Sequence, residues 1–227
     1  MDDDQPNTVL IQIEISDDDT SNQQSQDMSE TTNQEPPDSP EQYNHPCLDL
    51  LDEGRRRDYI DICVPLYRAS LVGDWEAVEE ILSINGEFRA DLLGYAITED
   101  DNDTLLHLAV YSQSIKFVEN IVNRMTDEQL VLQDNDGQTA LHRVAAVGNV
   151  DMARVMVERC PQMLTIRDSD DDLPIYMAAF NGKHNMVAYL YGEYKSMEGN
   201  DWRDQDIYTV FLQCIEADLF GTFLVSL

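Results

Sequence analysis

The sequence predicts an all-α solenoid of four to five helix-turn-helix units, and three observations support this prediction. The phrase Thr-Leu-Leu-His-Leu-Ala at residues 104–109 returns in altered form at 139–145 and 173–179, with a weaker copy at 65–69. Its His or Tyr position recurs at 107, 142 and 176, so the period is 35 and then 34 residues. A second apolar stripe follows each copy, and clusters of turn-forming residues separate the copies. Such a period is typical of stacked two-helix units.

The residues within one unit predict a helix, a tight turn and a second helix. Pro174 stands where a helix can begin, because its missing N–H would have no partner there. Gly148 and Gly182 suit helix ends that need a left-handed backbone. Asn149 is a capping residue, and the apolar residues that follow it keep the spacing of one helical face. A second helix is therefore expected to start directly after Asn149.

Three acidic clusters, at residues 100–103, 134–137 and 168–171, are expected to form the turns between units. Asp, Asn, Ser and Gly favour turns because their short side chains bond to the nearby backbone or tolerate a positive φ. The sequence predicts a positive φ at Asn102, Gly137 and Asp171. Calcium binding is the alternative for these clusters, but none has the residue order of an EF-hand loop.

With these features in place, the chain resembles the ankyrin repeat, whose pattern is Asp-Gly-x-Thr-Pro-Leu-His-x-Ala-Ala-x-x-Gly. Residues 136–148 depart from it only at Ala140 and Val144, whereas the second unit has Gln113 in place of the last glycine. The resemblance places an ankyrin domain at residues 51–227, after a tail at 1–50. Its units are expected near residues 65–98, 101–134, 136–168 and 170–200, with a divergent terminal pair at 206–227.

The opening unit, around residues 66–76, is similar to that of a plant ankyrin family. In that family a membrane domain with a Pro-Gly-Gly motif normally follows the repeats. No apolar run of the roughly 18 residues typical of a membrane helix occurs in this chain. The membrane half is therefore expected to be absent, either because this is a short natural form or because the gene model is incomplete. The sequence alone does not separate these two explanations.

The N-terminal tail is predicted to be disordered. Residues 1–44 contain 12 Asp or Glu and no Lys or Arg, and such a segment cannot bury enough apolar surface to offset its chain entropy. These acids account for −12 of the net charge of −31, and residues 45–227 carry the other −19. The acidic charge argues against nucleic acid or an anionic membrane as a partner, and favours a protein with a basic or mixed surface.

One apolar cluster interrupts the tail and resembles a SUMO-interacting motif. An alternating strand precedes an acidic run at residues 17–19, as in motifs that add a strand to a partner's sheet edge. The strand residues are Val9, Leu10, Ile11 and Ile13. The alternative is an incidental β-prone patch in a disordered segment.

No combination of residues predicts catalysis, a cofactor or a metal site. The resemblance implies that His107 and His142 are structural, each bridging backbone turns between units. The four cysteines lack metal-ligand spacing and are expected to be reduced thiols. The expected location is the cytoplasm, with the plasma membrane, reached through a membrane-anchored partner, as the alternative.

The sequence therefore predicts a non-catalytic protein–protein interaction module, an adaptor or regulator, which the resemblance places in plant stress or defence signalling. The alternative is a soluble form of a membrane-anchored ankyrin signalling or transport protein that associates with its full-length relatives. In ankyrin arrays the partner meets the turn tips and the exposed face of each first helix. In this chain the corresponding residues are Arg68, Asn102, Leu108, Tyr111, Ser112, Asn135, Gln138, Arg143, Val147, Ser169, Asp171, Met177, Phe180 and Asn181. For Tyr111, Met177 and Phe180, packing between units is the competing explanation.

Overall fold

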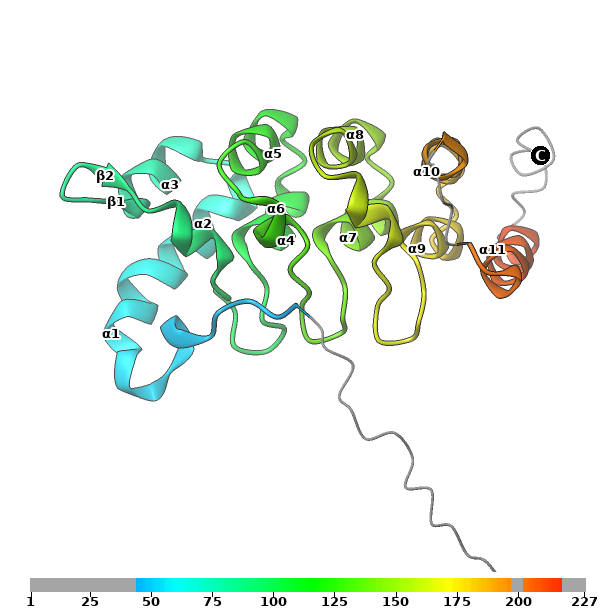
Figure 1. Ribbon diagram of the computed structural model, residues 1–227. Helices are drawn as coiled ribbons and strands as arrows, with labels where there is room; N and C mark the ends of the chain where they lie inside the picture. Colours follow the sequence, from blue (N-terminus) through cyan, green and yellow to red (C-terminus); the bar gives the residue numbers. More distant parts are fainter. Residues whose placement is uncertain (1–43, 197–201, 218–227) are drawn as a thin grey trace, which may run out of the picture. The chain divides into compact units, whose positions relative to one another are not determined.

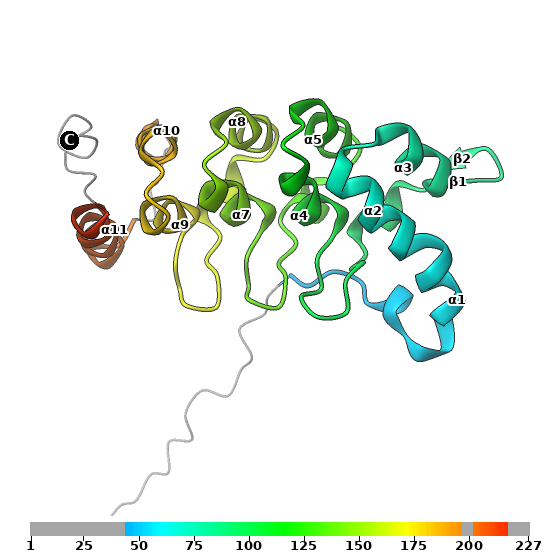
Figure 2. The same ribbon diagram turned by 180° about the vertical axis from the view of Figure 1, so that it is seen from behind.

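The computed structural model describes residues 44–196 and 202–217, and these form an array of paired helices (Figures 1 and 2). The inner helices are α2 (Val64–Val72), α4 (Leu105–Ala109) with its continuation η5 (Val110–Ser112), α7 (Ala140–Val147) and α9 (Pro174–Phe180). The outer helices are α3 (Trp75–Leu82), α5 (Ile115–Val122), α8 (Val150–Arg159) and α10 (His184–Ser196). Both views show the two kinds of helix in two rows, with the turns projecting from the inner row. The predicted all-α solenoid is confirmed.

The third unit shows how the sequence forms this arrangement. Thr139 caps α7, and Gly148 ends it with a φ of 88°. The side chain of Asn149 then accepts a hydrogen bond of 3.2 Å from the backbone N–H of Met152, which starts α8. Each cap satisfies backbone groups that the short helices leave without partners.

Small side chains allow the inner helices to pack closely against one another. Ala109, Ala145 and Ala179 are all fully buried in the core that runs along the array. One apolar face of each outer helix covers this row from the other side, as Met152 and Met156 of α8 do. Each unit therefore buries its apolar surface only by stacking on its neighbours.

The acidic clusters form the turns between units, as predicted. The backbone φ is positive at all three expected positions, with values of 56° at Asn102, 71° at Gly137 and 63° at Asp171. At Gly137 a Cβ atom would also lie 2.7 Å from the backbone nitrogen of Ser169 in the next turn. Glycine is therefore required here both by the backbone conformation and by the close approach of the next unit.

The N-terminal boundary differs from the predicted one, because residues 44–50 already pack against the array. Backbone hydrogen bonds of 3.0 Å join Cys47 to Gly94 and Ala96, and Leu50 is buried in the core. The short helices η1 (Asp49–Leu51) and η2 (Glu53–Arg55) follow. The inner helix of the first unit then begins early, as α1 (Arg56–Asp58) and the π-helical η3 (Tyr59–Cys63), and continues without a break into α2. Residues 1–43, including the strand at 9–13, lie outside the described residues.

A β-hairpin accounts for the long, 40-residue spacing between the first two copies of the repeated phrase. Strands β1 (Ser83–Ile84) and β2 (Glu87–Phe88) pair antiparallel across Asn85 and Gly86, which both have a positive φ. Asn-Gly is the preferred pair for such a two-residue turn. Each link from an outer helix to the next inner helix contains a short helix. These are η4 (Ala90–Gly94), α6 (Asp127–Leu130) and η6 (Pro161–Thr165).

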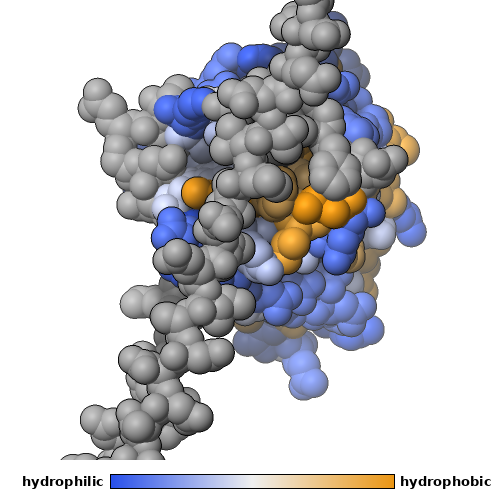
Figure 3. All heavy atoms as spheres, turned by 90° about the vertical axis from the view of Figure 1, so that its right-hand side faces the viewer, coloured by the Kyte–Doolittle hydropathy of each residue, from blue (hydrophilic) through white to orange (hydrophobic). Residues whose placement is uncertain are grey.

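The described array ends at α11 (Asp204–Glu216), which packs on α9 and buries Val210 and Cys214. This is the first helix of the predicted terminal pair, and residues 218–227 lie outside the described residues. Ile207, Tyr208 and Leu212 of α11 stay exposed. Figure 3 shows hydrophobic residues at the surface of this end of the array. Among the described residues no helix has both the length and the apolar character needed to cross a membrane.

Candidate protein-binding surface

Large apolar side chains recur at one register of the inner helices and remain exposed. They stand four residues after the His or Tyr of the repeated phrase: Leu71 is 42% exposed, Tyr111 49% and Phe180 59%. The third unit has the smaller Ala146 at this register. Tyr176 stacks on Phe180 with 6.1 Å between ring centroids, which enlarges the apolar area on α9. Leu71 was not among the predicted residues, although its spacing from Tyr67 could have identified it.

The structure places the predicted binding residues at different depths. Leu108 is only 3% exposed and packs in the core that runs along the array, so a partner cannot reach it. The exposed members are Arg68, Tyr111, Asn135, Ser169, Asp171, Phe180 and Asn181. The half-buried members are Asn102, Ser112, Gln138, Arg143, Val147 and Met177.

His107 and His142 lie at equivalent places and join each unit to the next. The Nδ1 atom of His107 accepts a hydrogen bond of 3.2 Å from the backbone N–H of Thr104, so the proton resides on Nε2. Nε2 then donates to the backbone oxygen of Gln138 at 3.0 Å. His142 repeats this pattern with the backbone oxygen of Asp172 at 3.3 Å. Burial lowers the pKa of both imidazoles to about 4, so the neutral form holds these bonds at physiological pH.

Arg143 has internal partners on three sides. Its Nη2 lies 2.8 Å from Oδ2 of Asp134 and 2.8 Å from Oδ1 of Asp103, and its Nη1 donates to the hydroxyl of Tyr111 at 3.0 Å. Burial disfavours the charged guanidinium, but the carboxylates of Asp103 and Asp134 outweigh it and raise the pKa of Arg143. Arg143 therefore orients Tyr111 and links two turns, and its charge is already compensated within the array.

The turn tips also bond to one another. The side-chain amide of Asn102 donates to that of Asn135, which in turn donates to the backbone oxygen of Asp100 at 2.7 Å. Asp171 accepts from Nη1 of Arg203 at 2.6 Å, and its carboxylate lies 3.6 Å from Nε of Arg167. Asp171 thus tethers the segment before α11 rather than presenting a free charge.

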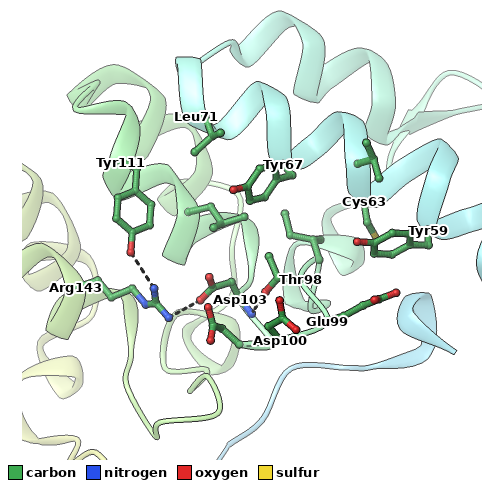
Figure 4. Close-up of a pocket in the computed structure, with 14 residues that line it drawn as sticks. Tyr59, Cys63, Tyr67, Leu71, Thr98, Glu99, Asp100, Asp103, Tyr111 and Arg143 are labelled. Carbon is green, nitrogen blue, oxygen red and sulfur yellow. Dashed lines mark hydrogen bonds and ion pairs between the residues drawn. The ribbon is translucent and has the colours of Figure 1, made fainter.

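A pocket of about 660 Å³ opens between the first helix, which is the continuous helix of residues 56–72, and the turn before α4 (Figure 4). The helix contributes Tyr59, Cys63, Tyr67 and Leu71, and the turn contributes Thr98 and the acidic residues Glu99, Asp100, Asp101 and Asp103. Burial, assisted by the negative charge of Asp58, raises the pKa of Cys63 to about 11, so its thiol is a poor nucleophile. No group of His, Cys, Asp and Glu in the described segments is arranged to hold a metal ion.

Comparisons with known proteins agree with this fold. Residues 106–206 match the family model of ankyrin repeats in three copies. A chain in the crystal structure of the yeast ribosomal protein Rps3 in complex with its chaperone Yar1 is similar, with a TM-score of 0.52 and 19% identity. That similarity covers 60% of this chain and 95% of the other, and it concerns the fold alone.

A short stretch also resembles a BTB/POZ domain-containing protein 1 of Schizosaccharomyces pombe, with 30% identity over 69 residues. The match spans 30% of this chain and only 5% of the fission-yeast protein. The family-model match identifies ankyrin repeats within residues 106–206.

Proposed function

We propose that this protein is a non-catalytic protein–protein interaction module, an adaptor or regulator, whose partner lies along the exposed face of the inner helices. The exposure of Leu71, Tyr111 and Phe180 at one repeated register is the observation that supports this most directly. The same helices contribute other apolar side chains to the core, such as Leu66, Leu106 and Ile175, so the exposed register is a distinct face. Exposed apolar side chains that recur along an array, beside polar turn tips, are typical of a protein-binding surface.

The similarity to a chain in a complex between a chaperone and its ribosomal protein supports a binding role for the fold. The excess of acidic residues supports a partner with a basic or mixed surface. The resemblance to plant ankyrin proteins adds that the module acts in stress or defence signalling. Within this proposal the full-length membrane relatives are one class of partner.

Site-specific photo-crosslinking tests the proposal. A photoreactive phenylalanine analogue replaces Phe180 on the inner face, and in a matched control it replaces Ala188, which is exposed on the outer helix α10. We expect a discrete adduct from position 180 and none from position 188. With the identified partner purified, Phe180→Ala should speed dissociation by about tenfold, because buried aromatic anchors carry much of the binding energy of an interface. Equal adducts from both positions would contradict the proposed surface.

A further inference from the structure

We propose that the pocket between the first helix and the turn at residues 97–103 binds the guanidinium group of an arginine on the partner protein. This inference rests on the proposed function and adds the chemistry of the partner. The pocket combines one wall of tyrosine rings with another of carboxylates (Figure 4). Both walls face the same space of about 660 Å³.

The aromatic wall depends on the π-helical turn of η3. Tyr59, Cys63, Tyr67 and Leu71 follow one another at four-residue steps. On an α-helix of about 3.6 residues per turn, such steps drift around the axis. A π turn holds more residues and shifts the register the opposite way, so Tyr59 stays on the same face as Tyr67. Figure 4 shows the rings of Tyr59 and Tyr67 on the side of the pocket that faces Asp103.

The opposite wall is strongly acidic. The pocket is lined by four carboxylates, those of Glu99, Asp100, Asp101 and Asp103, against the single cation of Arg143. In the part of the chain that the structure describes, no basic side chain forms an ion pair with Glu99, Asp100 or Asp101. Burial raises the pKa of Tyr59, and the negative charge of Glu99 raises it further. The field of the acidic wall therefore reaches the tyrosine on the opposite wall. The lining therefore has the charge to hold one more cation.

Asp103 gives the pocket a buried carboxylate oxygen whose charge is met by one cation. Asp103 is 2% exposed, and among the described residues no donor makes a well-aligned hydrogen bond to its Oδ1 atom. Nη2 of Arg143 forms an ion pair with this atom at 2.8 Å, and the same nitrogen donates a hydrogen bond to Oδ2 of Asp134. Burial raises the pKa of Asp103 to about 6, against the opposing effect of Arg143. A second donor in the pocket would satisfy this oxygen and favour its charged form.

A guanidinium fits this combination of walls better than an ammonium. Its flat face stacks on aromatic rings while its edge donates several hydrogen bonds to carboxylates. The chain shows the same arrangement elsewhere: Arg124 lies 4.4 Å from the ring centroid of Trp75 and 2.6 Å from Oε1 of Glu79. The pocket offers a similar pairing, with the tyrosines in place of Trp75 and Asp103 in place of Glu79.

The test is an NMR titration of the full chain with three capped pentapeptides. Their sequence is Gly-Gly-X-Gly-Gly, where X is arginine, lysine or citrulline, the uncharged isostere of arginine. We expect saturable amide shifts around Tyr59, Tyr67 and Asp103 with the arginine peptide at concentrations up to about 10 mM. Binding of the citrulline peptide should be at least tenfold weaker. Binding of the lysine peptide should be severalfold weaker.

Three variants and a control test the assignment of residues. Asp103→Asn should weaken binding of the arginine peptide by at least tenfold. Glu99→Gln and Tyr67→Leu should each weaken it severalfold. Asp151→Asn, an exposed acid on the outer helix α8, should leave the binding of the arginine peptide unchanged. If Asp103→Asn does not fold, judged by circular dichroism, the other two variants still decide the question.

The inference is overturned by an absence of saturable shifts, by shifts that map elsewhere, or by equal binding of the arginine peptide and either of the others. The outcome for the proposed function can be distinguished from the outcome for the arginine pocket. If the peptide does not bind but the crosslink from position 180 still forms, the interaction surface stands and the arginine pocket does not. If the peptide binds and that crosslink is absent, the pocket stands and the wider surface must be reassigned.

Discussion

His107 and His142 each connect one unit to the next through a single neutral ring. Nδ1 receives a backbone N–H of its own turn, and Nε2 donates to a backbone oxygen of the following turn. Few side chains other than a neutral imidazole offer an acceptor and a donor at opposite edges of one small ring. This explains why the residue recurs in the repeated phrase.

Replacing His142 by alanine should lower stability without altering the binding surface. The variant loses the bond to the backbone oxygen of Asp172 and leaves buried backbone groups without partners. We expect a loss of about 1–3 kcal/mol in the free energy of unfolding, measured by urea denaturation. The affinity of the partner, expressed per folded molecule, should not change. A variant of full stability with impaired binding would contradict the structural role.

The same residue should produce a pH-dependent difference between the variant and the wild type. The pKa of His142 is about 4 in the fold and about 6.5 when unfolded, so its stabilising contribution is complete above about pH 6.5 and is lost as the pH falls toward 4. Asp103 and Asp172, whose pKa values burial raises to about 6, act in the opposite direction, but they are present in both proteins. The gap in unfolding free energy between wild type and His142→Ala should therefore shrink between about pH 7 and pH 5. A constant gap would show that the imidazole is not held neutral.

Single residues differ in how well the sequence predicts them. The positive φ values at Asn102, Gly137 and Asp171 were predictable because turn chemistry is local. The burial of Leu108 and the ion pairs of Arg143 were not, because they depend on residues from other turns and helices. The pocket was missed for the same reason, since its two walls meet only after the chain has folded.

Among the inner helices, that of the second unit has the shortest α-helical part. The α-helical part of α4 spans only five residues before it tightens into η5. Gln113, with a φ of 55°, takes the place where the neighbouring units have glycine. A side chain in this conformation costs roughly 1 kcal/mol relative to glycine. The hairpin at residues 83–88 adds exposed backbone before this unit.

Amide hydrogen exchange should therefore be faster around residues 83–113 than around 139–190. In a solenoid each unit is held by its neighbours, so the weakest unit opens first. Gln113→Gly should stabilise the chain and reduce the difference, because the relief of backbone strain exceeds the loss of the side-chain hydrogen bonds that Gln113 makes with the backbone oxygen of Val110 and the amide of Asn149. Uniform protection across the units would show that the array opens as one body instead.

The elements of the first unit were only partly predictable. The repeated phrase identified α2, but nothing periodic in residues 53–63 indicated that the helix begins at Arg56. Composition placed residues 44–50 in the acidic tail, whereas Leu50 is buried in the core and Cys47 forms backbone hydrogen bonds with Gly94 and Ala96, far along the chain. The pair Asn85-Gly86 is a local signal for a hairpin turn. The long spacing of 40 residues between the first two copies of the phrase leaves room for this hairpin.

At the scale of the whole molecule, most arginines of the described array are engaged in internal ion pairs. Arg55, Arg89, Arg124, Arg143, Arg159, Arg167 and Arg203 each contact a carboxylate of the same chain. The excess acids are therefore left to face solvent, among them Asp136 and Asp170 at the turn tips. These free charges are expected to steer a basic partner, while the apolar side chains between the tips hold it.

Neutralising the tips should consequently change association, and truncating the apolar residues should change dissociation. The suitable tip variant is Asp136→Asn with Asp170→Asn, because Asp171 is bound to Arg203 and its loss would disturb the contact with the segment before α11. We expect this double variant to associate more slowly and to show a weaker dependence on salt, since charges beyond about 10 Å are screened at about 0.1 M. Asp151→Asn on the outer helix α8 is the matched control. Tyr111→Ala should instead speed dissociation at both salt concentrations. If kinetics with the purified partner show unchanged dissociation for Tyr111→Ala, its ring serves packing with Arg143 and not the interface.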